Sequence, residues 1–139
     1  MSGSADQPGF VVQRDADSAP FFDASARGEL LVRRCPQCAA WYPPQQRACP
    51  ADAAPLEWAT ASGGATLVSW GVEHGPVLDQ ALATPDGHTS VVGLVELAEG
   101  PWLHAAIVGT DPATLRAGAP LSVRFVQLGD EAVPAFTAV

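Results

Sequence analysis

Two short cysteine turns decide the fold: Cys35-Pro-Gln-Cys38 and, after ten intervening residues, Cys49-Pro-Ala-Asp52. A structural zinc site takes four ligands in a tetrahedron, and ligands with two residues between them let one tight turn present a pair. The segments that flank these turns, 29–34 and 56–58, are short and strand-like. Cys-Pro turns joined by short strands are typical of a zinc ribbon. We therefore predict a zinc ribbon over residues 29–61.

The second turn lacks a fourth cysteine, because Asp52 stands in its place. A carboxylate oxygen ligates zinc at about 2.0–2.2 Å, slightly closer than the about 2.3 Å of a thiolate. Zinc is therefore the candidate cofactor, and the candidate ligands are Cys35, Cys38, Cys49 and Asp52. The alternative is a degenerate ribbon that has lost its metal and is held by packing of its aromatic side chains.

A redox role for Cys35 and Cys38 is a weaker interpretation. A thioredoxin-type pair begins a helix that follows a strand, whereas here a proline follows the first cysteine and no βαβ unit is present. The odd total of three cysteines also argues against a disulfide framework.

A short helix is predicted before the ribbon, within residues 17–28. Ser18 can cap it, Pro20 suits its first turn, and Gly28 can end it in the left-handed conformation. Phe21 and Phe22 supply its large apolar groups, so packing against other elements must stabilise it. Residues 1–16 are polar and aperiodic, and we expect a mobile arm there.

Residues 62–139 are rich in strands and predict a five-stranded, OB-type barrel. A turn at 98–101 separates two apolar runs, and the cap, proline and closing glycine of Asp111–Gly118 predict a helical turn. Val68, Trp70 and Val72 share one face of the first run. The predicted strands are Thr66–Glu73, Ser90–Leu97, Trp102–Val108, Pro120–Leu128 and Val133–Val139. The expected fold class is thus mainly β: N-terminal helix, zinc ribbon and barrel.

The composition narrows the function classes. The chain has 139 residues and a formal net charge of −8, and it is 47% hydrophobic and 16% charged, which is typical of a globular protein. The beginning of the sequence has no secretory pattern, and the apolar runs of about five residues are far short of the roughly 20 that a membrane helix needs. We expect a soluble, cytoplasmic protein.

Several motifs occur in order along the chain. Besides the two cysteine turns, they are Gly28-Glu29-Leu30, Tyr42-Pro43-Pro44, Glu57-Trp58, Ser62-Gly63-Gly64, Val95-Glu96-Leu97-Ala98-Glu99-Gly100-Pro101 and Leu115-Arg116-Ala117-Gly118. From about Phe21 onward, the chain resembles the zinc-ribbon and OB-fold accessory proteins of thiolase-superfamily enzymes. The family pattern has four cysteines in the ribbon, so Asp52 is a departure that concerns metal binding rather than fold.

This resemblance implies a helix, a rubredoxin-like ribbon and an OB barrel. It also implies a non-catalytic subunit of a hetero-oligomer, whose thiolase-like or aldolase partner acts on acyl-CoA thioesters. Some members of the family form aldolase complexes that shorten steroid side chains, and others serve acyltransferases or thiolases. The expected role is to bind the partner and to help bind or position acyl-CoA.

The residues themselves point to no catalytic centre. The three histidines, His74, His88 and His104, share no spacing that places two of them beside a nucleophile. His104 alone in a strand is more typical of a packed or surface residue than of a general base. A free-standing thioesterase or lyase is kept as an alternative hypothesis.

The charge is unevenly distributed. Residues 24–50 contain four arginines and one acid, a balance of +3, so the rest of the chain sums to −11. Arg33, Arg34 and Arg47 are candidates for contacts with CoA phosphates or with an acidic partner, because arginine binds phosphate through two donors at once. The alternative is that they are simply solvated. Of Trp41 and Tyr42, we expect one in the core of the ribbon and one at an interface.

A second function class is a single-stranded nucleic-acid binder, which OB barrels permit. Such a binder needs a basic groove with stacking aromatics. Residues 53–139 hold two arginines and nine acids, a balance of −7. The acidic barrel therefore disfavours this alternative.

Overall fold

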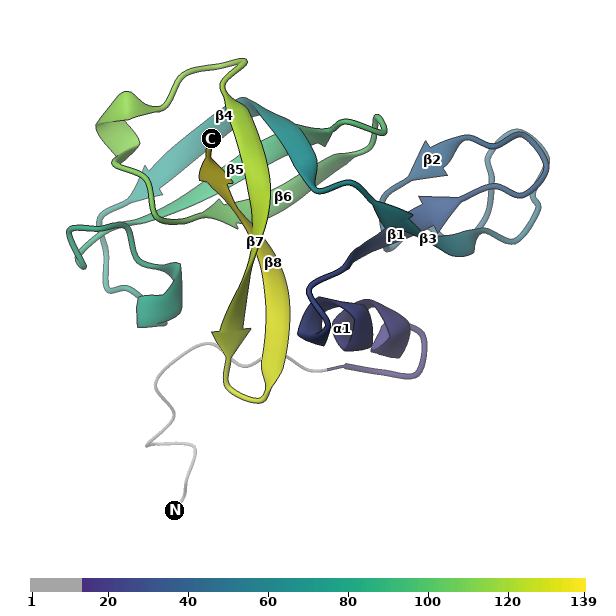
Figure 1. Ribbon diagram of the computed structural model, residues 1–139, viewed down its shortest axis with the longest axis horizontal. Coiled ribbons are helices and arrows are strands. Elements are labelled where there is room, and N and C mark those ends of the chain that lie inside the picture. The colour runs from purple at the N-terminus through teal and green to yellow at the C-terminus, as the bar shows by residue number, and fades with distance from the viewer. Residues whose placement is uncertain (1–13) are drawn as a thin grey trace.

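The computed structural model describes residues 14–139 and contains a helix, a small sheet and a barrel (Figure 1). The predicted arm over residues 1–16 lies largely outside this range. The elements are α1 (Ala19–Ala26), β1 (Leu30–Arg34), β2 (Trp41–Tyr42), β3 (Glu57–Ala61), β4 (Gly64–Glu73), the 3-10 helix η2 (Gln80–Leu82), β5 (Ser90–Leu97), β6 (Trp102–Ile107), the 3-10 helix η3 (Pro112–Thr114), β7 (Pro120–Leu128) and β8 (Glu131–Ala138).

Helix α1 lies beside β1 and against β8 (Figure 1). Pro20 is in its first turn and Gly28 follows it at φ +79°, as the sequence predicts. The Ser18 side chain does not cap the helix. Its hydroxyl and its backbone N–H both donate to the Asp15 carboxylate instead. Arg14 bonds Asp23 of α1 at 2.6 Å and Glu131 of β8 at 2.6 Å, and so ties the helix to the barrel.

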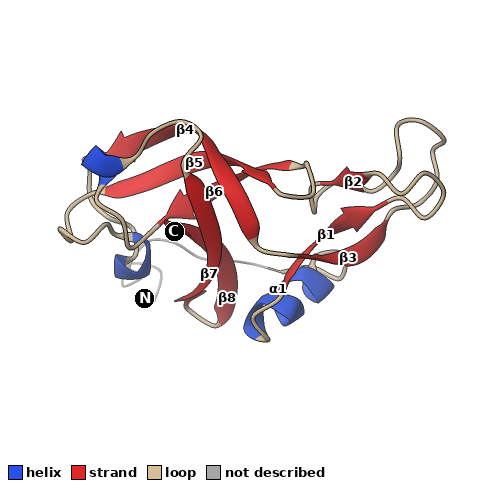
Figure 2. Cartoon of the chain, turned by 45° about the horizontal axis from the view of Figure 1, so that its top comes forward, coloured by secondary structure: helices blue, strands red, loops and turns tan. Residues whose placement is uncertain are grey.

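The ribbon is a three-stranded antiparallel sheet in the order β2-β1-β3. It projects from one end of the barrel, and its β3 leads directly into the first barrel strand (Figure 2). Its base shares a core with the barrel, since Leu30, Val32 and Ala61 belong to the same buried cluster as Leu67 and Phe136. Each fully buried aliphatic side chain of this kind stabilises the fold by about 1.5–3 kcal/mol.

Five strands close into the barrel in the order β4-β5-β6-β8-β7. All neighbouring pairs are antiparallel except β6 and β8, which meet in parallel at Ile107 and Phe136. A β-bulge between Leu67 and Ser69 changes which residues of β4 face inward. Leu67 is buried before the bulge, and Val72 packs against the core after it. The predicted mainly β architecture with its N-terminal helix and five-stranded barrel is confirmed.

The observed bounds differ from the predicted ones by a few residues at several strand ends. Asp111 begins the predicted helical turn and accepts a hydrogen bond from the backbone of Ala113, but the regular part is a single 3-10 turn. Among the residues the structure describes, no helix combines the length and the apolar character that a membrane crossing requires.

Candidate metal centre and flanking surfaces

The two cysteine turns have the same backbone geometry. In the first, Cys35 N–H donates to the Ala40 carbonyl and Ala39 N–H donates to the Cys35 carbonyl, both at 2.9 Å. In the second, Cys49 N–H donates to the Ala54 carbonyl at 2.9 Å and Ala53 N–H donates to the Cys49 carbonyl at 2.7 Å. Asp52 therefore occupies the position in its turn that Cys38 occupies in the other.

Both turns also close through an alanine in the left-handed region, Ala39 at φ +64° and Ala53 at φ +58°. A non-glycine residue pays about 1–2 kcal/mol for this conformation. A strained backbone at two equivalent positions is typical of a functional site whose geometry the surrounding structure enforces. The sequence carries a signal for this geometry, since Cys-Pro-x-x-Ala occurs at 35–39 and again at 49–53.

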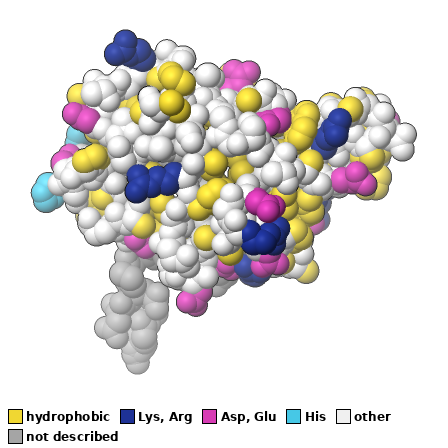
Figure 3. Space-filling model, viewed as in Figure 1, with side chains coloured by type: hydrophobic (Ala, Val, Ile, Leu, Met, Phe, Trp, Pro, Cys, Tyr) yellow, Lys and Arg dark blue, Asp and Glu magenta, His cyan; other side chains and the backbone are white. Residues whose placement is uncertain are grey.

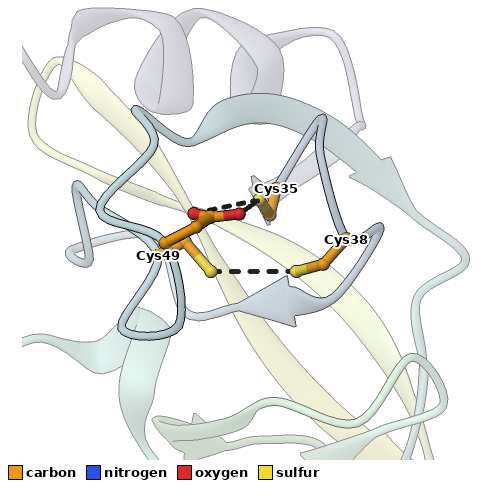
Figure 4. A group of neighbouring side chains, drawn as sticks. Cys35, Cys38 and Cys49 are labelled. Atoms are coloured by element: carbon orange, nitrogen blue, oxygen red, sulfur yellow. Dashed lines mark hydrogen bonds between the residues drawn. The ribbon is translucent and has the colours of Figure 1, made fainter.

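Figure 4 shows the cysteine side chains converging between the two turns. Cys38 Sγ lies 3.7 Å from Cys49 Sγ, and Cys35 Sγ lies 3.7 Å from the nearer oxygen of Asp52. The four ligand atoms all lie within 4.8 Å of one another. A tetrahedron with metal–sulfur bonds of about 2.3 Å has sulfur–sulfur edges of about 3.8 Å. Three thiols and a carboxylate are thus positioned to hold a metal ion.

Hydrogen bonds favour the ligating protonation states of two of the four candidates, Cys49 and Asp52, whereas the pKa of Cys38 is raised by the neighbouring Cys35 thiol and by burial. Tyr42 lies with its Oη 3.5 Å from Cys49 Sγ; this contact lowers the pKa of Cys49 and, together with burial, raises the pKa of Tyr42 to about 12. The Ala54 N–H donates to Asp52 at 2.9 Å and lowers the pKa of that carboxyl. A metal binds the deprotonated forms of both ligand types, so these contacts support binding.

The three candidate arginines lie in different environments. On the face drawn in Figure 3, basic side chains lie scattered among acidic and hydrophobic ones rather than in one patch. Arg33 is buried: its guanidinium stacks 3.6 Å from the Trp58 ring centroid and donates to the Pro44 carbonyl at 2.9 Å. Arg34 is exposed beside Trp41, with its guanidinium carbon 5.3 Å from the ring centroid. Arg47 keeps 71% of its side chain exposed and pairs with Asp17 at 3.1 Å. Of the three candidates, one is therefore buried and two are accessible.

The two aromatics of β2 are both half-buried. Tyr42 packs against the small cluster of Cys35, Cys49 and Leu56, whereas Trp41 packs against the larger shared core. Tyr42 thus lies in the ribbon core, and an interface role for the half-buried Trp41 stays a prediction. Among the described residues, the most exposed tryptophan is Trp102 on β6, at 51%. The sequence does not indicate that Trp102 is exposed, because this residue lies in an ordinary apolar run.

The histidines remain apart from any catalytic arrangement in the described part of the chain. His74, His88 and His104 are all exposed. Within residues 14–139, none of their side chains takes part in a hydrogen bond or an ion pair that would orient a general base. His104 lies on the outer face of β6, at the boundary of two adjoining surface grooves.

The geometry defines the class of protein: a cysteine ribbon that shares a common core with an OB-type barrel. Residues 58–126 match the family model described as "ChsH2, C-terminal OB-fold domain". The barrel of this chain thus belongs to the family of ChsH2 C-terminal OB-fold domains.

Two curated relatives are similar over most of this chain. One is the 3-oxo-4,17-pregnadiene-20-carboxyl-CoA hydratase alpha subunit of Mycobacterium tuberculosis, 28% identical over 116 residues, which are 82% of this chain. The other is a probable enoyl-CoA hydratase alpha subunit of Thermomonospora curvata, 31% identical over 117 residues, or 83% of this chain. The aligned region is 35% of each relative, so this chain spans about a third of their length.

Two solved structures share the architecture. A chain of the structure described as "Ltp2-ChsH2(DUF35) aldolase" superposes with a TM-score of 0.78 and 26% identity, over 92% of this chain and 98% of that one. A DUF35-family protein of unknown function from Sulfolobus solfataricus superposes with a TM-score of 0.60 and 11% identity, over 89% and 86% of the two chains. The second likeness concerns the fold alone.

Proposed function

We propose that this chain is a non-catalytic accessory subunit that binds a thiolase-like or aldolase partner and helps bind or position an acyl-CoA substrate. One observation carries the proposal: the likeness to a chain of the Ltp2-ChsH2(DUF35) aldolase extends over helix, ribbon and barrel, at 92% of this chain and 98% of that one. The likeness thus covers nearly the whole of that solved chain, which supports a subunit of the same kind.

The proposed division of labour follows from the side chains. The partner supplies the nucleophile and the acid–base groups for breaking or forming a carbon–carbon bond. This chain supplies a rigid surface at the entrance of the partner's active site. Its exposed histidines without an orienting partner among residues 14–139 support the absence of chemistry of its own. The relatives' names, which contain acyl-CoA and a pregnadiene skeleton, favour steroid side-chain or related lipid degradation.

The proposed metal is zinc, held by Cys35, Cys38, Cys49 and Asp52. The ligand distances and the three thiols support this choice, because thiolates select zinc among the common divalent ions. With four protein ligands the site is closed, so the ion would have a structural role and contribute to folding. Tyr42 would support it by donating a hydrogen bond from its hydroxyl to the Cys49 thiolate.

Arg34 and Arg47 are the proposed contacts for CoA phosphates or for an acidic surface of the partner. Both guanidinium groups are accessible to a second molecule. In this proposal Arg33 acts indirectly: stacked on Trp58 and bonded to the Pro44 carbonyl, it holds the segment that leads to Arg47.

Co-expression with the thiolase-superfamily protein of the same genome, followed by size-exclusion chromatography, tests the proposed assembly. The expected result is one peak that contains both chains in a fixed ratio. Two separate peaks would contradict it. The variant Arg34→Ala/Arg47→Ala should weaken the complex or its CoA affinity, while Arg116→Ala, on an exposed barrel position, serves as the matched control.

A further inference from the structure

A second surface feature, a groove of about 490 Å³, lies away from the metal cluster. It is bounded by α1, by the segment before β5, by β5 and β6, and by the beginning of β8. Six of its lining side chains carry the argument: Phe22, Leu78, Leu82, Val92, Ala106 and Pro134. A volume of this size is typical of sites for small organic molecules, which range over about 300–1,000 Å³.

The groove occupies the place where OB barrels bind their ligands. That place is the face of the second and third strands, flanked by the loops that join the first strand to the second and the fourth to the fifth. In this barrel the second and third strands are β5 and β6, and the two loops are 74–89 and 129–130. The groove contacts both strands and includes Leu78 from the first loop and Leu128 and Val133 from the strand ends beside the second.

The groove is apolar, whereas OB barrels that bind single-stranded nucleic acid have a basic groove at this place. Among its lining residues the one acid is Glu73, and there is no arginine. Leu78 and Val92 are left 57% and 47% exposed, so apolar area remains to be covered. Ala106, which lies opposite the exposed Val92, keeps the wall of the groove low, because a larger side chain there would fill it. Covering this surface favours an uncharged hydrocarbon, because the gain in free energy grows with the apolar area removed from water.

The groove adjoins a second one of about 440 Å³. The two share Phe21, Phe22 and His104, and the second also includes the ion-paired Arg47 and Asp17 among its lining residues. An apolar groove beside a groove that contains a cation suits an amphiphile with a bulky hydrocarbon end.

We infer that this groove binds the bulky, uncharged hydrocarbon portion of the acyl thioester. The inference rests on the proposed function, because that function names an acyl thioester as the substrate. It goes beyond that function by placing the hydrocarbon on this chain, on the outer face of β5 and β6, rather than on the partner.

Equilibrium dialysis of the full chain with progesterone, an uncharged four-ring molecule, tests the inference. Wild-type protein should bind it saturably. Ala106→Phe fills the groove, and Leu78→Glu places a charge at its largely exposed rim with little effect on folding. Each should weaken binding about tenfold or more, which is at least about 1.4 kcal/mol. The matched control Ser122→Phe, on an exposed position of β7 outside the groove, should bind like wild type.

Absence of saturable binding, or equal binding by all four proteins, would overturn the inference. Dimerisation of the wild-type chain that Ala106→Phe abolishes would overturn it too, because a second copy would then be the occupant. A chain that binds progesterone but no thiolase-like partner would overturn the proposed function alone. A complex that forms normally around a chain without progesterone binding would overturn the inference alone.

Discussion

Cys35 Sγ and the nearer carboxylate oxygen of Asp52 lie 3.7 Å apart, the same separation as the sulfurs of Cys38 and Cys49. Since both turns have the same hydrogen bonds, the carboxylate stands where a fourth sulfur would stand. A shorter metal–oxygen bond can be accommodated by a small shift of that one side chain. Asp52 is therefore a proposed ligand rather than a sign of a lost site.

Removal of the carboxylate should release the metal. Asp52→Ala leaves three ligands, so we expect less than about half of the wild-type zinc content and a lower melting temperature, since binding free energy of a structural zinc contributes to folding. Asp52→Cys should retain zinc at about one per chain and resist a chelator longer. Elemental analysis of the purified proteins measures both, with Asp130→Ala in the exposed β7–β8 turn as control. Full zinc content in Asp52→Ala would show that the carboxylate is dispensable.

Arg33 should matter to stability more than the exposed arginines. Arg33→Ala removes a stacked guanidinium, worth about 0.5–2 kcal/mol, and leaves the Pro44 carbonyl without its donor, at about 1–3 kcal/mol. We expect the free energy of unfolding to fall by about 2–4 kcal/mol in urea titrations, whereas Arg27→Ala on the surface should change it by less than about 0.5 kcal/mol. Equal effects of the two substitutions would contradict the buried role.

Gly63, at the junction of ribbon and barrel, should not tolerate a side chain. Its φ is +94°, and a Cβ would lie 2.6 Å from Cγ1 of Val123. Gly63→Ala should therefore cost about 2–4 kcal/mol, from backbone strain and overpacking together. Gly100→Ala is the control for strain alone, because φ is +115° there and nothing lies within 4 Å. If Val123→Ala in the Gly63→Ala background fails to recover part of the loss, the steric explanation is wrong.

The loop before β5 should respond to acid. Asp86 accepts hydrogen bonds from the backbone of His88 and from the hydroxyl of Thr84, which lower its pKa from 3.8 to about 2. A lowered pKa stabilises the folded state above pH 3.8, and this contribution is lost as the pH falls towards 2. Melting temperatures should therefore fall more steeply over this window in wild type than in Asp86→Asn. Parallel curves would contradict the assignment.

The sequence predicted the architecture because its signals are local. Cysteine turns, the glycine after α1 and the alternating runs of the barrel each specify a backbone conformation over a few residues. The candidate metal ligands could be predicted for the same reason, since each turn carries its own pair.

Contacts between distant segments could not be predicted. Nothing near Arg33 in the sequence indicates that it stacks on Trp58, or that Asp17 pairs with Arg47. The apolar groove is formed where α1, β5, β6 and β8 meet, and in the sequence the side chains of each element are typical of ordinary packing residues. The β-bulge in β4 could not be predicted either, because a one-residue insertion leaves the alternation of inward and outward side chains intact on each side of the bulge.

Turnover of an acyl-CoA substrate, measured with this chain alone, the thiolase-like partner alone and the two mixed, tests the central claim most directly. The accessory role predicts no turnover by this chain alone and a partner rate that rises with added chain until a fixed molar ratio is reached. Turnover by the isolated chain, or a partner whose rate is unaffected by it, would contradict the account.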